Sequence, residues 1–158
     1  MKRIICICIS LCLLMGMALA DQEVKLPGEH FTLSLPDGME YSPKNARDAE
    51  QSAYFQFAYF STKLGLEMDV FAYDNGGVTL SALAEAMKEK QQDVELRRIN
   101  GIDVLTYYGE DDPATSDGAM YIGYVLMDGS QAVEITFWYG TQQSADKAQE
   151  IMSTLQQS

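Results

Sequence analysis

The feature that most constrains the fold of this chain is the dipeptide Asn100-Gly101, which joins two alternating segments at about 94–99 and 102–108. Both residues accept the positive φ angles of a type I′ turn, so the pair is the strongest short-range signal for a β-hairpin. Alternation of apolar and polar residues with a period of two is typical of a half-buried strand. The sequence therefore predicts an antiparallel hairpin at this point.

Other segments of the chain also have strand character, and turn-forming residues separate them. The stretch 53–60 is rich in aromatic residues, which favour strands. Pro36-Asp37-Gly38 and Asp128-Gly129-Ser130 are typical of turns. Residues 39–52 are polar, which predicts a loop. Besides the hairpin, the expected strands are 31–35, 53–60, 66–73, 119–127 and 131–139.

Two segments change to a period of 3.6 residues, which predicts helices. Thr79 is a suitable N-cap for a helix over 79–91, and the last helix is expected to start near Ser144. Because hairpins dominate, we expect an α+β fold: an antiparallel sheet of about six or seven strands, with packed helices that leave one face partly open. The helix residues expected to be buried are Leu80, Leu83, Ala84, Met87, Ala145, Ala148, Ile151, Met152 and Leu155.

The N-terminal segment has the order of a secretory signal peptide. A basic start, Met1-Lys2-Arg3, precedes an apolar stretch, and Ala18-Leu19-Ala20 matches a cleavage site. A single transmembrane anchor is the alternative interpretation, but the apolar run is short for a span, which needs about 20 residues. We therefore expect a signal peptide over 1–20, a single domain over 21–158, and no membrane insertion after cleavage.

All three cysteines lie inside this N-terminal segment. Cys12 lies in the middle of the apolar stretch, which disfavours a lipoprotein signal. The mature chain would therefore have neither disulfides nor a thiol nucleophile, although an oxidising compartment permits disulfides. An exported single domain without cysteine suggests a bacterial protein that is secreted or held in the cell envelope.

The amino-acid composition favours some classes of binding partner over others. With 47% apolar residues, the chain is not disordered as a whole. It carries 23 acidic and 11 basic residues, a formal charge of −12. Nucleic acids and anionic membranes require a basic surface, so neither is expected as the main partner. An acidic domain favours an unknown protein or peptide partner of basic character.

Three stretches carry a resemblance to a known family. They are 31–39 (FTLSLPDGM), 99–103 (INGID), and 134–137 (EITF) leading to 151–155 (IMSTL). The chain resembles PsbP and Mog proteins, and most of all the small secreted PsbP-like proteins of bacteria. This resemblance spans nearly the whole mature chain. It implies an α-β-α sandwich around an antiparallel sheet and a non-enzymatic, partner-binding role, and it supplies no catalytic residue.

The motifs of common enzymes are missing from the sequence. His30 is the single histidine and has no motif around it, so a His-based triad and a His/Cys zinc site are not expected. The sequence Ser144-Ala145-Asp146-Lys147 matches S-x-x-K, but the companion motifs of that enzyme class are missing. Ser144 is better interpreted as a helix N-cap. We expect no enzymatic activity and no cofactor.

The acidic loop after the hairpin is the weak alternative for a metal. It contains Glu110, Asp111, Asp112 and Asp117. Calcium takes six to eight oxygen ligands, which carboxylates and carbonyls supply. The spacing fits no EF-hand, so a solvated loop is the preferred interpretation.

The second sheet face is the candidate binding surface. Glu67, Asp69, Phe71 and Tyr73 alternate on one strand, and Glu134, Thr136 and Trp138 alternate on another. Carboxylates with aromatic rings hold a sugar or a cationic peptide, because the rings supply contact area and cation–π attraction. The candidate site residues are Glu67, Asp69, Tyr108, Glu134 and Trp138, with Tyr124 a further member if the registers allow.

Three function classes remain open. The first is an exported, non-enzymatic binding domain for a protein or peptide. The second is a module for a small ligand or calcium, and it would use the acidic loop or the Trp138 face. The third is a small hydrolase, because Glu67 and Asp69 stand two residues apart, a spacing compatible with a glycosidase pair. An opposing interpretation is that a helix covers this face and Trp138 packs beneath it.

Overall fold

The computed structural model describes residues 21–43, 53–90, 93–110 and 119–158. Its centre is a seven-stranded sheet in which every neighbouring pair is antiparallel. The strand order is β3-β4-β5-β9-β8-β7-β6, so β3 and β6 are the two edges. The bounds are β3 Glu40–Ser42, β4 Phe55–Ser61, β5 Leu66–Asp74, β6 Asp93–Ile99, β7 Ile102–Glu110, β8 Met120–Asp128 and β9 Gln131–Tyr139.

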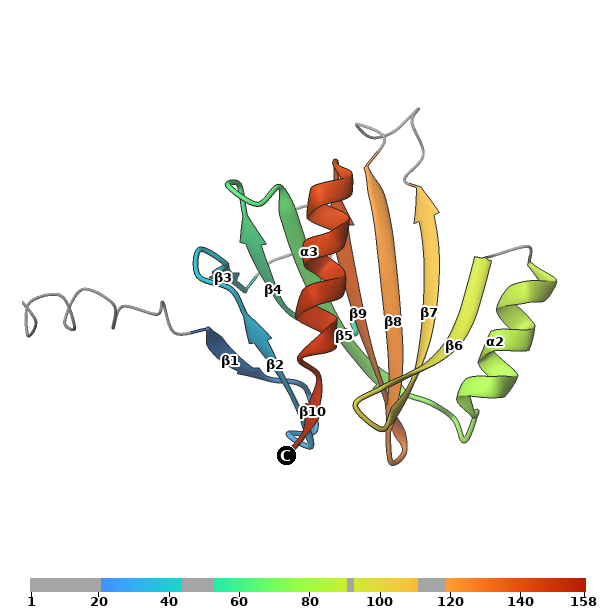
Figure 1. Cartoon of the computed structure of the whole chain (residues 1–158). Coiled ribbons are helices and arrows are strands. Elements are labelled where there is room, and N and C mark those ends of the chain that lie inside the picture. Colours follow the sequence, from blue (N-terminus) through green and yellow to red (C-terminus); the bar gives the residue numbers. More distant parts are fainter. Residues whose placement is uncertain (1–20, 44–52, 91–92, 111–118) are drawn as a thin grey trace, which may run out of the picture.

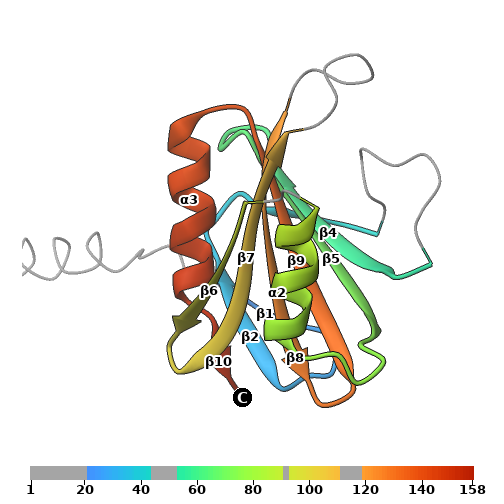
Figure 2. The same ribbon diagram turned by 90° about the vertical axis from the view of Figure 1, so that its right-hand side faces the viewer.

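A second, three-stranded sheet joins the two ends of the described chain in the order β1-β2-β10. Its strands are β1 (Gln22–Lys25), β2 (Phe31–Leu35) and β10 (Gln156–Gln157). This small sheet and helix α3 (Gln142–Ser153) cover one face of the large sheet, and helix α2 (Leu80–Glu89) lies on the other (Figures 1 and 2). The result is a layered α+β sandwich, as the sequence predicts.

Two apolar clusters hold the layers together. The larger one packs α3 and the small sheet against the large sheet, and fully buried Met68, Phe137 and Leu155 belong to it. The smaller cluster lies under α2, where Ala84 packs against β7, β8 and β9. The helices therefore cover opposite faces of the sheet. The smaller cluster covers only part of the sheet face on which α2 lies. The candidate sites described below lie on this same side of the sheet.

The structure corrects three details of the strand prediction. Residues 40–42 form the edge strand β3, although a loop is expected there. Strand β2 lies in the small sheet and not in the large one. The strands β1 and β10 are too short and polar to be found from periodicity, and they form because β2 offers them a partner on each side. The remaining expected strands are confirmed to within about two residues.

The helix starts show one correct prediction and one error. Thr79 caps α2, and its side chain accepts a hydrogen bond from the backbone N–H of Ala82. Ser144 is not the cap of α3: Thr141 is, and it accepts from the N–H of Ser144. The Ser144 hydroxyl donates to the carbonyl of Leu64 at 2.8 Å and so ties α3 to the β4–β5 turn.

The hairpin at Asn100-Gly101 is confirmed. Both residues have positive φ, 49° and 86°, and Ile99 pairs with Ile102 across the turn. These are the angles that a type I′ turn requires. Within the part of the chain that the structure describes, no helix is long and apolar enough to cross a membrane.

Candidate functional site

The registers bring most of the predicted site residues onto one face, here called the acid–aromatic face (Glu67, Asp69, Phe71, Tyr73, Glu134 and Trp138). On β5 and β9, Glu67 pairs with Trp138 and Phe71 pairs with Glu134. Directly opposed residues of an antiparallel pair project to the same side of a sheet. This is the side on which α2 packs, because Tyr73 also contacts the cluster under that helix.

Tyr108 and Tyr124 do not join this face, so that part of the prediction is wrong. Tyr108 pairs with Ile122, and Tyr124 pairs with Ile135, residues of the larger core on the α3 side. Because neighbouring positions on a strand point to opposite sides, Tyr107 and not Tyr108 faces α2. The Tyr108 hydroxyl accepts a hydrogen bond from Arg97 at 3.1 Å.

The carboxylates of the acid–aromatic face are held by neighbouring aromatic residues. The Trp138 indole N–H donates to Asp69 Oδ2 at 3.0 Å. Glu134 accepts two phenolic hydrogen bonds, one from Tyr73 at 3.1 Å and a short one from Tyr107. Burial raises the pKa of both tyrosines, and the negative charge of Glu134 raises it further. The tyrosines therefore stay neutral donors at physiological pH.

This bonding changes the interpretation of the face. Asp69 has no solvent exposure, and Thr136 beside it is also buried. Trp138 packs against Tyr121, with ring centroids 4.9 Å apart. Glu67, Asp69, Glu134 and Trp138 are thus brought together as predicted. However, the carboxylates of Asp69 and Glu134 accept hydrogen bonds from neighbouring aromatic side chains. This favours a packed, hydrogen-bonded surface over an open recognition surface.

The acidic loop gives no metal site that the structure can place. Glu110 ends β7, whereas Asp111, Asp112 and Asp117 lie outside the described residues. Among the residues described, no group of three or more His, Cys, Asp or Glu side chains is arranged to hold a metal ion.

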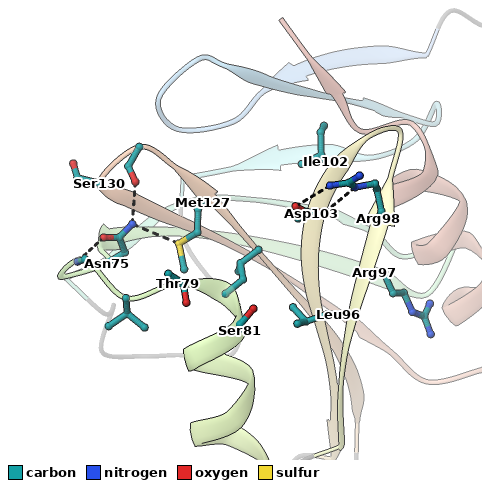
Figure 3. Close-up of a pocket in the computed structure, with 14 residues that line it drawn as sticks. Asn75, Thr79, Ser81, Leu96, Arg97, Arg98, Ile102, Asp103, Met127 and Ser130 are labelled. Atoms are coloured by element: carbon teal, nitrogen blue, oxygen red, sulfur yellow. Dashed lines mark hydrogen bonds and ion pairs between the residues drawn. The ribbon is translucent and has the colours of Figure 1, made fainter.

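A groove with a volume of about 1060 Å³ lies at the N-terminal end of α2 (Figure 3). It is bounded by the start of α2 with the loop before it, by the β6–β7 hairpin, and by the end of β8 with the β8–β9 turn. We call it the α2 groove. Its lining residues are Asn75, Gly77, Val78, Thr79, Leu80, Ser81, Leu96, Arg97, Arg98, Ile102, Asp103, Met127, Gly129 and Ser130.

The α2 groove exists because the hairpin leaves the sheet at this point. The β7–β8 ladder ends at the pair Leu105 and Val125, although β7 begins three residues earlier, at Ile102. The hairpin tip is attached elsewhere. The Asn100 amide donates to the carbonyls of Ser153 and Leu155 at the end of α3, at 2.8 and 2.9 Å. A hairpin held toward α3 leaves space on the α2 side.

The lining of the α2 groove is apolar with a polar rim. Val78 and Leu96 are 46% and 48% exposed, a large fraction for such side chains. Met127 also lines the groove, and its sulfur accepts a hydrogen bond from the Asn75 amide at 3.5 Å (Figure 3). At the rim, Arg98 donates two hydrogen bonds to Asp103, which lower the pKa of that carboxyl.

Sequence reasoning did not find the α2 groove. Leu96 belongs to an alternating strand, and such a pattern indicates burial. Val78 follows two glycines and looks like a loop residue. The sequence does predict the two elements that bound the groove, namely the hairpin at Asn100-Gly101 and the helix that begins near Thr79. It does not predict the space between them, because that space depends on tertiary contacts of the hairpin with α3.

Comparisons with known proteins add the fold class. No family model and no curated protein matches the sequence. The solution structure of cyanobacterial PsbP (CyanoP) from Synechocystis sp. PCC 6803 is similar, with a TM-score of 0.60, 11% sequence identity, and coverage of 90% of this chain and 96% of that one. A crystal structure from Bacteroides thetaiotaomicron VPI-5482 has a TM-score of 0.61 and 18% identity over 89% of this chain.

These likenesses establish the class that the architecture defines: this chain has a PsbP-like α+β fold. The fold resemblance that the sequence indicates is therefore confirmed. The match to cyanobacterial PsbP extends over nearly all of that protein, whereas this chain spans about half (49%) of the Bacteroides chain. At such low identities the likeness concerns the fold alone, and function has to be argued from the site.

Proposed function

We propose that the protein is an exported, non-enzymatic binding domain that holds a segment of a partner protein in the α2 groove. The observation that carries this proposal is the exposure of Val78 and Leu96 on facing walls of a groove of about 1060 Å³. Exposed apolar walls with a polar rim are the anatomy of a recognition site, because the apolar centre supplies affinity and the rim supplies specificity.

Export and the class of partner rest on the sequence. The signal-like segment 1–20 supports a secreted or envelope location, and the excess of acidic residues favours a basic partner. Long-range attraction between such a partner and the acidic domain speeds association and is screened by salt. Apolar contact in the α2 groove would then hold the bound segment.

A small apolar molecule is the second candidate occupant. Sites for small ligands have volumes of roughly 300–1,000 Å³ and mostly apolar walls. The α2 groove reaches this size with Val78, Leu96 and Met127 on its surface. It is an open groove along the hairpin, and this shape favours an extended peptide.

The test is an affinity capture with three immobilised forms of residues 21–158: wild type, Val78→Glu and Met120→Glu. Val78 lies in the α2 groove, and Met120 is a matched control that is 44% exposed at the far end of β8. We expect one stoichiometric protein from an envelope extract to bind wild type and the control and to be lost from Val78→Glu. Equal retention by all three forms would refute the groove as the site, and empty captures repeated with crosslinking would refute a protein partner.

A further inference from the structure

Strand β6 is an open edge of the large sheet. It pairs with β7 on one side, and no other described strand pairs with its outer side. Figure 2 looks onto this edge, with α2 and α3 standing on either side of the sheet. An uncovered edge presents a row of free backbone groups, which is a template for another strand.

The turn decides which backbone groups of β6 face outward. Ile99 and Ile102 flank the two-residue turn, so they exchange hydrogen bonds with each other. Because hydrogen-bonded positions alternate along an antiparallel pair, Asp93, Glu95, Arg97 and Ile99 direct their N–H and C=O groups toward β7. Val94, Leu96 and Arg98 therefore direct theirs outward. A strand added to this edge must bond to these three residues.

A second copy of β6 satisfies this rule in a single favourable register. If two copies pair about Leu96, Val94 and Arg98 also bond to each other's backbone, and all seven residues of β6 are paired. This register places Glu95 of each copy opposite Arg97 of the other, in the closely spaced type of pair. Centring on position 95 or 97 instead would set Glu95 against Glu95 or Arg97 against Arg97.

The side chains complement one another in the same register. Leu96, which is 48% exposed, would meet its own copy on the α2 side. Glu95 and Arg97 lie on the opposite side of the strand, where they pair within one chain at 2.6 Å. In the paired copies, Glu95 of each chain would face Arg97 of the other, which gives two further pairs of opposite charge. Strand β6 also carries two acidic and two basic residues in an acidic chain, so copies meet there without net repulsion between the strands.

We propose that two copies of the chain associate through antiparallel pairing of their β6 strands, centred on Leu96. The large sheets then form one continuous sheet across the two-fold axis, and the two α2 grooves open on the same side of it. Leu96 also lines the α2 groove, so pairing encloses this part of the groove wall between the two copies. The molar mass in solution reports the pairing whether or not the groove is filled.

Charge reversal in trans tests the proposal, with the molar mass in solution as the readout. Wild-type residues 21–158 are expected to reach twice the monomer mass as concentration rises. Glu95→Arg and Arg97→Glu should each stay monomeric, because each sets like charges against each other across the axis. An equimolar mixture of the two variants should recover the dimer, because every cross-strand pair is again of opposite charge. Glu150→Arg, on α3, is the matched control and should dimerise.

The mixture separates an interface from a folding defect, since a misfolded chain is not repaired by another variant. Leu96→Pro is a second test: it removes an outward N–H that β7 does not use, so the monomer should fold and the dimer should be lost. A wild type that stays monomeric up to millimolar concentration overturns the proposal. Single reversals that still dimerise, or a mixture of folded variants that stays monomeric, overturn it equally.

Discussion

At the scale of single residues, the layer under α2 depends on close contacts between tyrosines and their neighbours. A Cβ added at Gly123 would lie 1.9 Å from the Tyr107 ring, so only glycine lets that ring lie flat across β8. In this position the Tyr107 hydroxyl reaches Glu134, which also accepts from Tyr73. Glu134 is half-buried, and a carboxylate taken partly out of water needs such donors, because an unpaired buried charge is costly.

The ionisation of the tyrosines should affect the stability of the layer under α2. Burial raises the pKa of Tyr73 and Tyr107, and burial also raises the pKa of Tyr124 to about 12. Since the folded-state pKa exceeds the unfolded value of 10.0, the stabilisation is complete below that pH and is lost as pH rises above it. We expect the melting temperature to fall as the pH rises from about 10 to about 12, and to fall less in Tyr107→Phe. An equal fall in both proteins would contradict this account.

At the scale of elements, Asn100 fastens the tip of the β6–β7 hairpin by hydrogen bonds, and the flanking Ile99 and Ile102 pack against the larger core. Asn100 adopts a positive φ of 49° and donates to two carbonyls at the end of α3. The last carbonyls of a helix lack partners within the helix, so these bonds also cap α3. Asn100 thus contributes to the turn, to the cap of α3 and to the position of the hairpin away from β8.

Substitution of Asn100 separates these roles. Asn100→Gly keeps access to positive φ and loses the two hydrogen bonds, at an expected cost of about 1–2 kcal/mol in the free energy of unfolding. Asn100→Ala also places an alanine in the left-handed region, which adds about 1 kcal/mol. Urea unfolding measures both values. If Asn100→Gly is as stable as wild type, the bonds to α3 do not hold the hairpin.

Elements were easier to predict from sequence than their placement. The Asn100-Gly101 turn and the alternation in β5, β8 and β9 are local signals, and the structure confirms them. The start of α3 was misplaced because Ser144 and Thr141 are both good caps, and only contact with Leu64 distinguishes their roles. The partition of β2 into a separate sheet depends on β1 and β10, whose sequences carry no period.

For the candidate site, too, local patterns in the sequence were informative and tertiary placement was not predictable. Alternation placed Glu67, Asp69, Glu134 and Trp138 on one face correctly. It could not place Tyr108, because one residue of register decides which side a tyrosine faces. The α2 groove was invisible to periodicity, since it forms where the β7–β8 ladder ends and the hairpin turns toward α3.

At the scale of the whole molecule, the sandwich protects one face of the large sheet more than the other. The small sheet and α3 cover the larger core, whereas α2 covers part of the opposite side and bounds the groove (Figures 1 and 2). The chain as a whole is acidic, whereas Arg97 and Arg98 of the hairpin line the groove. The account therefore assigns binding to the α2 side.

Site-specific photocrosslinking in cells of the source organism tests this central claim most directly. A photoreactive amino acid is placed at Val78, in the α2 groove, or at Met120, which is equally exposed outside it. The account predicts a discrete adduct with one other protein from position 78 and none from position 120. Adducts of equal yield from both positions, or an adduct from position 120 alone, would contradict the assignment of the α2 groove as the binding site.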